Sequence, residues 1–538
     1  MCGSETVDKP LGFGAGCCGG TVMILRQEFN IVKGRFMSKY LYPLFCLSLG
    51  LPVCAQVSFP GLFSDHAIVQ RDAATAVWGR AEPGEQVAVT LGTVKGAATA
   101  AADGWWLAKL DTTKLADGPF ELKATAASGS AVSSDILVGE VWLAAGQSNM
   151  EFTMKGGFGP VMDYAQREAA CKGRPIRMFR APKRSEAAPI RFDAKGEWRV
   201  ISPETLPRVS AVGYTFIDTL QKSIGGAAGV VDVSWSGTRC WAWMPRERID
   251  AHPELKAERL HQEELIAKGE GAKVRKPVIR CWNNQFMPVS QLSCRGVIWY
   301  QGCCDSGLRD AHHVYPKWLS YMVEEWRREM GKPELPFLYC QLAGWGDIES
   351  KPEACPSKAY LREGQRRARK LIPHSAMAVI LDNSEHEIHG RFKGPAGDRL
   401  AALALNRVYG RKNVACQSPD FVKADFAADA ATVTFDVAGS PLTAGPVRET
   451  YTWNARSNDV IRIARRSSPA SQLEGFTIRG GDGVWRWADA RITGPDTVKV
   501  WAAGASNPTA VRYNMRSQGF GNLYNAAGLP ASCFTTEE

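Results

Sequence analysis

A serine lies at the point where an apolar run of the sequence stops. Residues 141–145 are apolar, and the tetrad Gly146-Gln147-Ser148-Asn149 follows directly. This pattern predicts a buried strand that carries Ser148 to a sharp turn at its carboxyl end, where α/β proteins keep their reactive groups. Serines in such turns often only shape the backbone. Ser148 is therefore a candidate nucleophile if the chain also supplies a base and donors for an oxyanion.

The best candidate for the base is His389. Histidine is the usual partner of a serine nucleophile because its pKa lies near neutrality. Among the eight histidines, His389 stands after an expected strand at residues 377–381 and before an expected helix at residues 399–409. Glu387 precedes it by two residues, and we interpret this carboxylate either as the group that orients the imidazole or as a solvated loop charge.

The middle of the chain alternates between expected strands and helices. The strands are expected at 229–234, 296–300, 337–342 and 377–381, and a helix is expected at 210–224. Tyr315, Leu319, Met322 and Trp326 share one face of a further helix. This alternation predicts a parallel sheet with helices on both faces and reactive groups at the strand carboxyl ends.

The two flanks of this region have strand patterns instead. Residues 56–137 contain short alternating segments between turns, which predicts an all-β sandwich. Helical periodicity stops after residue 410, and alternating segments such as 431–437 and 497–501 predict a second β region. We therefore expect four parts, at residues 1–55, 56–137, 138–410 and 411–538.

The first of these parts has the pattern of a secretory signal. Met37 opens a segment with one positive charge, an apolar run at residues 41–51 and a cleavage position after Ala55. We expect residues 1–36 to be an extension before the true start, and the protein to be secreted or periplasmic. No integral membrane segment is expected after cleavage. Lipidation at Cys54 is the second interpretation.

The string Gly146 to Met150, followed by Glu151, resembles the nucleophile block of the SGNH hydrolases, and most of all the sialate O-acetylesterase branch. Residues 62–72, 77–89 and 510–532 resemble the terminal segments of the same family. The resemblance implies a three-layer α/β/α SGNH-hydrolase domain with flanking all-β, sandwich-like domains. It also implies an exported serine esterase that removes O-acetyl groups from sialic acids or sialoglycans.

The resemblance assigns roles to residues in three separated blocks. Ser148 is the nucleophile, His389 is the base, and Glu387 takes the place of an acid that commonly precedes Ile-His. The oxyanion hole is formed by the N–H of Ser148, by Gly237 and by Gln301. Some relatives use a Ser/His dyad, with a backbone carbonyl as the orienting group.

The sequence departs from the family pattern at three places. These are His386, where many SGNH enzymes have Asp; Gly390, where Pro is typical; and Cys303-Cys304-Asp305, where relatives have Glu-Ser-Asn. Two alternatives therefore stay open: an esterase that acts on acetylxylan or another glycan, and a glycan-binding relative without catalysis.

Composition and motifs exclude several other classes of function. The chain has a formal net charge of +10, but its basic residues form no concentrated stripe with interleaved aromatics. No nucleic-acid partner is therefore expected. The densest basic run, residues 362–370, is interpreted as a solvated helix face. No zinc-type cysteine spacing, phosphate loop or dinucleotide fingerprint is found, and we expect no metal and no cofactor.

Overall fold

The computed structural model describes residues 56–538, apart from residues 158, 272–273, 275–278, 309, 348, 446–449, 455–458, 464–472 and 538. The expected extension and signal peptide at residues 1–55 lie outside the described residues. Within the described part of the chain, no helix has the length and apolar character needed to span a bilayer.

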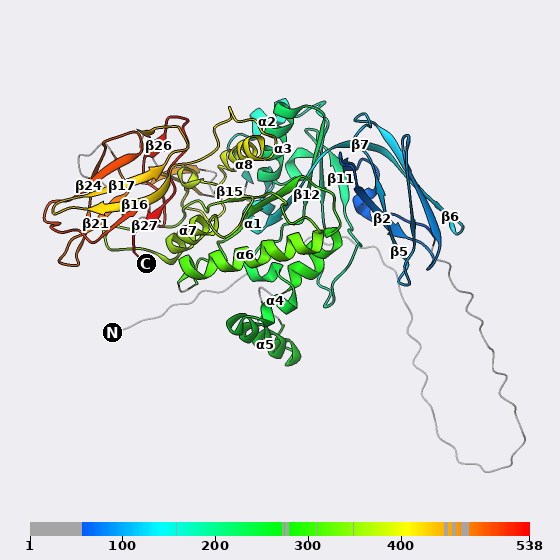
Figure 1. Cartoon of the computed structure of the whole chain (residues 1–538), viewed down its shortest axis with the longest axis horizontal. Coiled ribbons are helices and arrows are strands. Elements are labelled where there is room, and N and C mark those ends of the chain that lie inside the picture. Colours follow the sequence, from blue (N-terminus) through cyan, green and yellow to red (C-terminus); the bar gives the residue numbers. More distant parts are fainter. Residues whose placement is uncertain are drawn as a thin grey trace, which may run out of the picture. The chain divides into compact units, whose positions relative to one another are not determined.

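A mixed sheet forms the centre of the molecule (Figure 1). Its strand order is β11 (Glu197–Val200), β10 (Ile176–Arg180), β12 (Ala227–Asp232), β7 (Gly129–Gly146), β13 (Gly296–Tyr300), β14 (Phe337–Cys340) and β15 (Ser375–Ala378). Neighbours in this order pair in parallel, except that β11 pairs with β10 antiparallel. The alternating pattern of the sequence therefore predicted the parallel sheet correctly.

Helices cover both faces of this sheet. In β7, Trp142 packs on Phe216 of α3, whereas Trp299 of β13 packs on Trp326 of α6. Trp142 pairs in register with Gly296, so these two positions share one face of the sheet. Trp299 lies three residues after Gly296, and side chains alternate along a strand, so Trp299 lies on the other face. The three-layer α/β/α arrangement follows, with α3 packed on α8 and α6 packed on α7.

Eight α-helices lie in the described part of the chain. Their bounds are α1 (Ser148–Glu151), α2 (Tyr164–Ala170), α3 (Ala211–Ile224), α4 (Arg246–Asp250), α5 (Pro253–Ala267), α6 (Ala311–Met330), α7 (Ser357–Ala368) and α8 (Gly394–Arg407). Helix α8 begins five residues before the position expected from the sequence, because Pro395 fits the first turn of a helix, where its missing N–H costs nothing. The expected helical face of α6 is confirmed, since Tyr315, Leu319, Met322 and Trp326 are all buried.

Strand β7 joins the central sheet to the preceding β region. Its first half pairs antiparallel with β6, and its second half pairs in parallel with β12 and β13. The expected division at residue 137 falls inside this single strand. The remaining strands of the region are β1 (Ile68–Gln70), β2 (Thr75–Arg80), β3 (Gln86–Leu91), β4 (Val94–Thr99), β5 (Trp105–Leu110) and β6 (Phe120–Ala126). Strands β2 and β5 form a separate two-stranded sheet, and β3, β4 and β6 continue from β7.

The last part of the chain is built from strands around its own apolar cluster. One four-stranded sheet contains β16 (Asp420–Phe426), β17 (Ala431–Asp436), β24 (Thr497–Trp501) and β23 (Asp489–Ile492). The other contains β22 (Trp485–Trp487), β21 (Phe476–Arg479), β25 (Ala510–Tyr513) and β27 (Phe534–Thr535). Two two-stranded sheets of this part are β18 (Leu442–Ala444) with β26 (Leu523–Asn525) and β19 (Thr450–Asn454) with β20 (Asp459–Ile463). A further two-stranded sheet, β8 (Lys155–Gly156) with β9 (Gly159–Pro160), lies between α1 and α2 in the α/β region. The flanking all-β regions are therefore present on both sides of the α/β sequence.

The interpretation of residues 362–370 as a solvated helix face was wrong. These residues belong largely to α7, but Arg362 is fully buried and Arg366 nearly so. Arg362 donates hydrogen bonds to the carbonyl oxygens of Arg516 and Ser517, and Arg366 forms an ion pair with Glu363. The side chain of Arg362 thus connects α7 to the C-terminal segment, because the carbonyl oxygens of Arg516 and Ser517 accept its hydrogen bonds.

We predict that Gly146→Ala destabilises the protein by about 3 kcal/mol. Gly146 has φ 132°, and a Cβ there would lie 2.3 Å from the carbonyl oxygen of Tyr300 in the neighbouring strand. The control is Gly331→Ala, which has φ 63° but open space around it, and which should cost only about 1 kcal/mol. Denaturant unfolding measures both, and equal losses would contradict the steric argument.

Candidate active site

Ser148 opens the short helix α1, directly after the end of β7. The turn is fixed by the two neighbouring strand ends: the N–H of Gln147 donates to the carbonyl of Tyr300 at 3.1 Å, and the N–H of Trp235 donates to the carbonyl of Gly146 at 2.9 Å. Ser148 itself is half-buried. The serine thus stands at the carboxyl edge of the parallel sheet, as the sequence predicted.

The Gln147 side chain ties this turn to the loop after β13. Its Oε1 accepts from the N–H of Gly302 at 3.1 Å and from the N–H of Cys304 at 3.3 Å. Gln147 is buried, so these bonds are shielded from water. The departure from the family pattern at Cys303-Cys304 therefore lies in a loop held by its backbone.

Asn149 brings the serine turn to the histidine loop. Its Nδ2 donates to the carbonyl oxygen of Ile388 at 3.1 Å and approaches Cys303 Sγ at 3.5 Å. Because Asn149 follows Ser148 and Ile388 precedes His389, the two predicted reactive residues lie in segments that touch. The pairing of the Ser148 hydroxyl with the imidazole stays a prediction.

Burial and a neighbouring positive charge lower the pKa of His389. Burial is the larger, because it penalises the charged imidazolium, and the positive charge of Lys393 acts in the same direction. The carboxylate of Glu387 opposes them and raises the pKa. The net direction is down, which keeps the imidazole neutral and able to accept a proton near neutral pH.

Glu387 is the most exposed of the predicted site residues. Its side chain is 54 % exposed, and its Oε1 lies 3.9 Å from Nδ1 of His386. His386 also contacts Asp347, at 3.1 Å. A second carboxylate, Glu385, lies deeper in the loop and accepts from the N–H of Phe392 at 2.8 Å. The role of Glu387 as orienting acid stays a prediction, and sequence reasoning gave Glu385 no role.

Gly237 lies in the loop after β12, close to the serine turn. The N–H of Ser236 donates to Glu151 Oε2 at 2.6 Å, which connects this loop to α1. Gly237 has φ 76°, a conformation that favours glycine, and no atom lies within 4 Å of the place where its Cβ would be. A substrate could therefore approach its backbone closely.

Gln301 lies in the same cluster, but its side chain is fully buried. Its Nε2 donates to the carbonyl of Thr238 at 3.0 Å and to Asp305 Oδ2 at 2.6 Å, and its Oε1 accepts from the Tyr315 hydroxyl at 2.9 Å. Asp305 also accepts from the N–H of Cys240. In this arrangement both amide hydrogens are in use, so Gln301 braces the Gly237 loop; its predicted role as an oxyanion donor would need these bonds to rearrange.

An open groove of ≈500 Å³ runs past Ser148. Its polar lining is dominated by cations: Lys155, Arg180, Arg199 and Arg208, against the single carboxylate of Glu151. Arg180 is neutralised by Glu151 at 3.1 Å, with Asp232 behind it at 3.5 Å, and Arg199 is paired with Glu197. Lys155 and Arg208 are exposed, and neither forms an ion pair with any described residue. The groove beside the serine therefore favours an anionic ligand.

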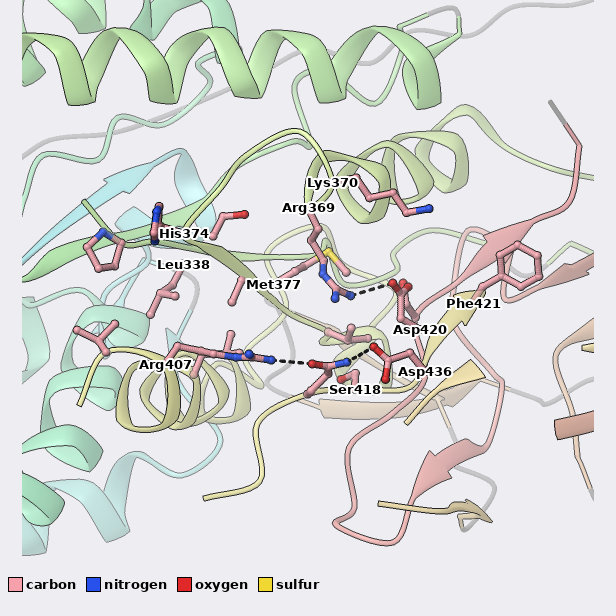
Figure 2. Close-up of a pocket in the computed structure, with 18 of the residues that line it drawn as sticks. Leu338, Arg369, Lys370, His374, Met377, Arg407, Ser418, Asp420, Phe421 and Asp436 are labelled. Atoms are coloured by element: carbon pink, nitrogen blue, oxygen red, sulfur yellow. Dashed lines mark hydrogen bonds and ion pairs between the residues drawn. The ribbon is translucent and has the colours of Figure 1, made fainter. Parts of the chain in front are cut away.

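A larger cavity, of ≈680 Å³, lies elsewhere (Figure 2). It is bordered by residues at the start of β14 and β15, by Arg407 at the end of α8, and by β16. Figure 2 shows Arg369 pointing to Asp420, with which it pairs at 3.0 Å. This cavity lies at the amino ends of the strands, whereas the reactive groups gather at the carboxyl ends. Among the described residues, no group of three or more His, Cys, Asp or Glu could hold a metal ion.

Sequence reasoning missed three residues that build this site: Asn149, Glu151 and Lys393. Asn149 and Glu151 lie inside the string noted for its resemblance, and Lys393 follows His389 by four residues, so their positions next to Ser148 or His389 were visible in the sequence. Their contacts were not, because each partner is separated from them by tens to hundreds of residues.

This chain is similar to known carbohydrate esterases. The family model described as "Carbohydrate esterase, sialic acid-specific acetylesterase" matches residues 138–389. Sialate O-acetylesterase of Mus musculus is 26% identical over 416 residues, which cover 67% of this chain and 75% of that protein. The Homo sapiens enzyme of the same name is 25% identical over 403 residues, covering 67% and 73%.

A solved structure is similar over nearly its whole length. The crystal structure of a carbohydrate acetylesterase from Xanthomonas citri is 30% identical, has a TM-score of 0.74, and is matched over 89% of this chain and 99% of that chain. The likeness extends beyond the central sheet to the flanking β regions, because it covers far more than residues 138–389.

We predict that Gln301→Met lowers the free energy of unfolding by about 3 kcal/mol, since it removes three buried hydrogen bonds and leaves their partners unsatisfied. Gln86→Met is the control, because Gln86 is exposed and its bond to Thr99 lies on the surface; its effect should stay within about 0.5 kcal/mol. Denaturant unfolding measures both variants. If Gln301→Met left stability unchanged, the bracing role would be wrong.

Proposed function

The chain belongs to the carbohydrate esterase family of sialic acid-specific acetylesterases, and from this premise we propose that it is an exported serine esterase that hydrolyses O-acetyl esters of sialic acids. That it is a carbohydrate esterase, and so a carboxylic ester hydrolase, follows from the family and from its likeness to the Xanthomonas citri enzyme. Export rests on the signal-like segment at residues 37–55.

The choice of an acidic sugar rests on the groove beside Ser148. Sialic acids carry a carboxylate, whereas the sugars of xylan's backbone are neutral. Lys155 and Arg208 stand in the groove as exposed cations outside any ion pair with the described residues. A guanidinium binds a carboxylate with two parallel hydrogen bonds, which fixes both the position and the orientation of the ligand. This single observation favours sialate esters over acetylxylan.

The proposed reaction uses a serine and a histidine. The Ser148 hydroxyl attacks the acetyl carbonyl while His389 takes its proton, and a tetrahedral oxyanion forms. The N–H of Ser148, which as the first residue of α1 has no acceptor within the helix, and the N–H of Gly237 stabilise this oxyanion. The intermediate then collapses, and His389 returns the proton to the departing sugar hydroxyl.

Water completes the cycle. His389 accepts a proton from water, the hydroxide attacks the acetyl group on Ser148, and acetate leaves as the serine regains its proton. The neutral state of His389 at the start of each half-reaction is what its burial and the nearby Lys393 favour. Glu387 is the proposed orienting acid, and its charge acts to stabilise the imidazolium that forms in each transition state.

We predict that the purified protein releases acetate from O-acetylated mucin faster than from acetylated xylan. Ser148→Ala should reduce the release by at least about a thousandfold, because it removes the nucleophile. Measuring acetate enzymatically on both polymers checks this. Activity on xylan alone would overturn the sialate substrate, and unchanged activity in Ser148→Ala would overturn the serine mechanism.

The same measurement tests the groove through charge variants. Arg208→Ala should raise KM on mucin about tenfold, since a charged contact to the sugar carboxylate is lost, and should leave hydrolysis of the neutral ester p-nitrophenyl acetate unchanged. Arg411→Ala is the control, because Arg411 is also exposed but lies outside the groove.

We predict an acidic limb in the pH profile of kcat/KM whose midpoint lies below pH 6.5. The base works in its neutral form, and burial and Lys393 lower the pKa of His389 from the ordinary histidine value of about 6.5. Activity therefore persists as the pH falls to 6.5 and is lost below it, as the imidazole protonates. A stopped-assay profile on p-nitrophenyl acetate measures the limb. A midpoint above pH 7, or a flat rate down to pH 4, would exclude His389 as the base.

A further inference from the structure

One buried lysine stands behind the proposed site. Lys393 precedes α8 and is only 4 % exposed. Its Nζ donates to Oδ1 of Asn149 at 2.5 Å and lies over the rings of Phe152, at 4.9 Å, and Tyr300, at 5.8 Å. A buried ammonium held by a neutral amide and two aromatic rings is costly, since none of these contacts supplies a full negative charge. Ionisable groups perturbed by burial cluster at functional sites.

The contacts of Asn149 connect this lysine to both reactive segments. Asn149 follows the nucleophile, its Oδ1 accepts from Lys393, and its Nδ2 donates to the carbonyl of Ile388, beside His389. The ammonium fixes which way the amide faces, because only the oxygen of the amide can accept from it. With the oxygen held by Lys393, the nitrogen is left to face the histidine loop.

The charge of Lys393 also acts on the imidazole. It lowers the pKa of His389, in the same direction as burial. The groups around Lys393 come from several elements: Tyr300 and Cys303 at the end of β13, Cys340 in β14, Glu385 and His389 in the histidine loop, and the paired Asp163 and Arg167 beside Gly394. Of these, the Glu385 carboxylate most favours the charged lysine, yet desolvation outweighs it and lowers the pKa of Lys393 to about 8.

We propose that Lys393 is a positioning residue of this esterase: it holds the Ser148 turn against the His389 loop through Asn149, and its positive charge keeps His389 in the neutral form. The inference rests on the proposed function, because it assigns work to Ser148 and His389. It predicts a bell-shaped pH profile. The acidic limb belongs to His389, and an alkaline limb appears as Lys393 loses its proton and releases the Asn149 oxygen.

The test compares the pH profiles of kcat on p-nitrophenyl acetate for the wild type, Lys393→Met and Lys393→Arg. Lys393→Met removes the charge and the donor, so kcat should fall about tenfold, the acidic limb should move upward by about half a pH unit, and the alkaline limb should vanish. Lys393→Arg keeps a charge that does not titrate in this range. It should leave the acidic limb in place while the alkaline limb vanishes.

The matched control is Lys332→Met. Lys332 is half-buried and donates to the backbone carbonyl of Cys294 at 3.3 Å, at the amino edge of the sheet and away from the serine. This variant should keep both limbs of the wild-type profile. A merely structural role for Lys393 would change kcat at all pH values without moving either limb, and that result would overturn the proposal.

Thermal unfolding shows whether each variant is folded. If neither Lys393 variant folds, the wild type and Asn149→Ala decide the matter. The proposal is overturned if the wild-type kcat shows no decline up to about pH 9.5. It is also overturned if the alkaline limb survives in Asn149→Ala, because this variant removes the hydrogen bond between Lys393 and Asn149. Absence of any turnover in the wild type overturns the proposed function itself, whereas turnover that depends on Ser148 with unmoved limbs overturns only the role of Lys393.

Discussion

Backbone hydrogen bonds at the carboxyl end of β7 are the interactions on which the site depends. The carbonyl of Gly146 accepts from Trp235, in the loop after β12, and the N–H of Gln147 donates to the carbonyl of Tyr300, the last residue of β13. Hydrogen bonds therefore continue between the three neighbouring segments at the end of the sheet. Parallel strands bring their loops to one edge, but they do not set the distances between those loops. The hydrogen bonds at the end of β7 set these distances. The buried Gln147 and Gln301 side chains add hydrogen bonds to the backbone of the neighbouring loops. The polar groups of the site are therefore placed mainly by the backbone.

Electrostatics then divides this edge into two environments. On the inner side, burial and a nearby ammonium favour a neutral imidazole. On the outer side, Arg180 is compensated by Glu151 and Asp232, while Lys155 and Arg208 face the groove. A proton acceptor benefits from low dielectric and a fixed orientation, whereas an anion-binding group must remain accessible to its ligand.

Much of this arrangement could be predicted from the sequence, because it depends on local patterns. The apolar run before Ser148, the alternation of strands and helices, and the loop of His389 each carry a signal within a short window. The fold and the family were predicted correctly for that reason. Residues 362–370 were not, since the burial of Arg362 depends on carbonyls of Arg516 and Ser517, about 150 residues away. For Gln301, likewise, the acceptors that hold its amide group belong to Thr238 and Asp305, and composition does not reveal them.

The departures from the family pattern lie in loops whose positions are set by main-chain hydrogen bonds. Cys303 and Cys304 replace polar residues, but the loop that carries them is held through its backbone N–H groups by Gln147, so its path does not require particular side chains. Gly390 replaces a proline, yet the histidine loop is anchored on both sides, by the carbonyl of Ile388 and by the N–H of Phe392. Where main-chain groups hold a loop, its side chains are free to change without moving the backbone of the serine turn. A fold and a backbone held in this way do not by themselves fix the ligand, because recognition depends on the side chains that the loops carry.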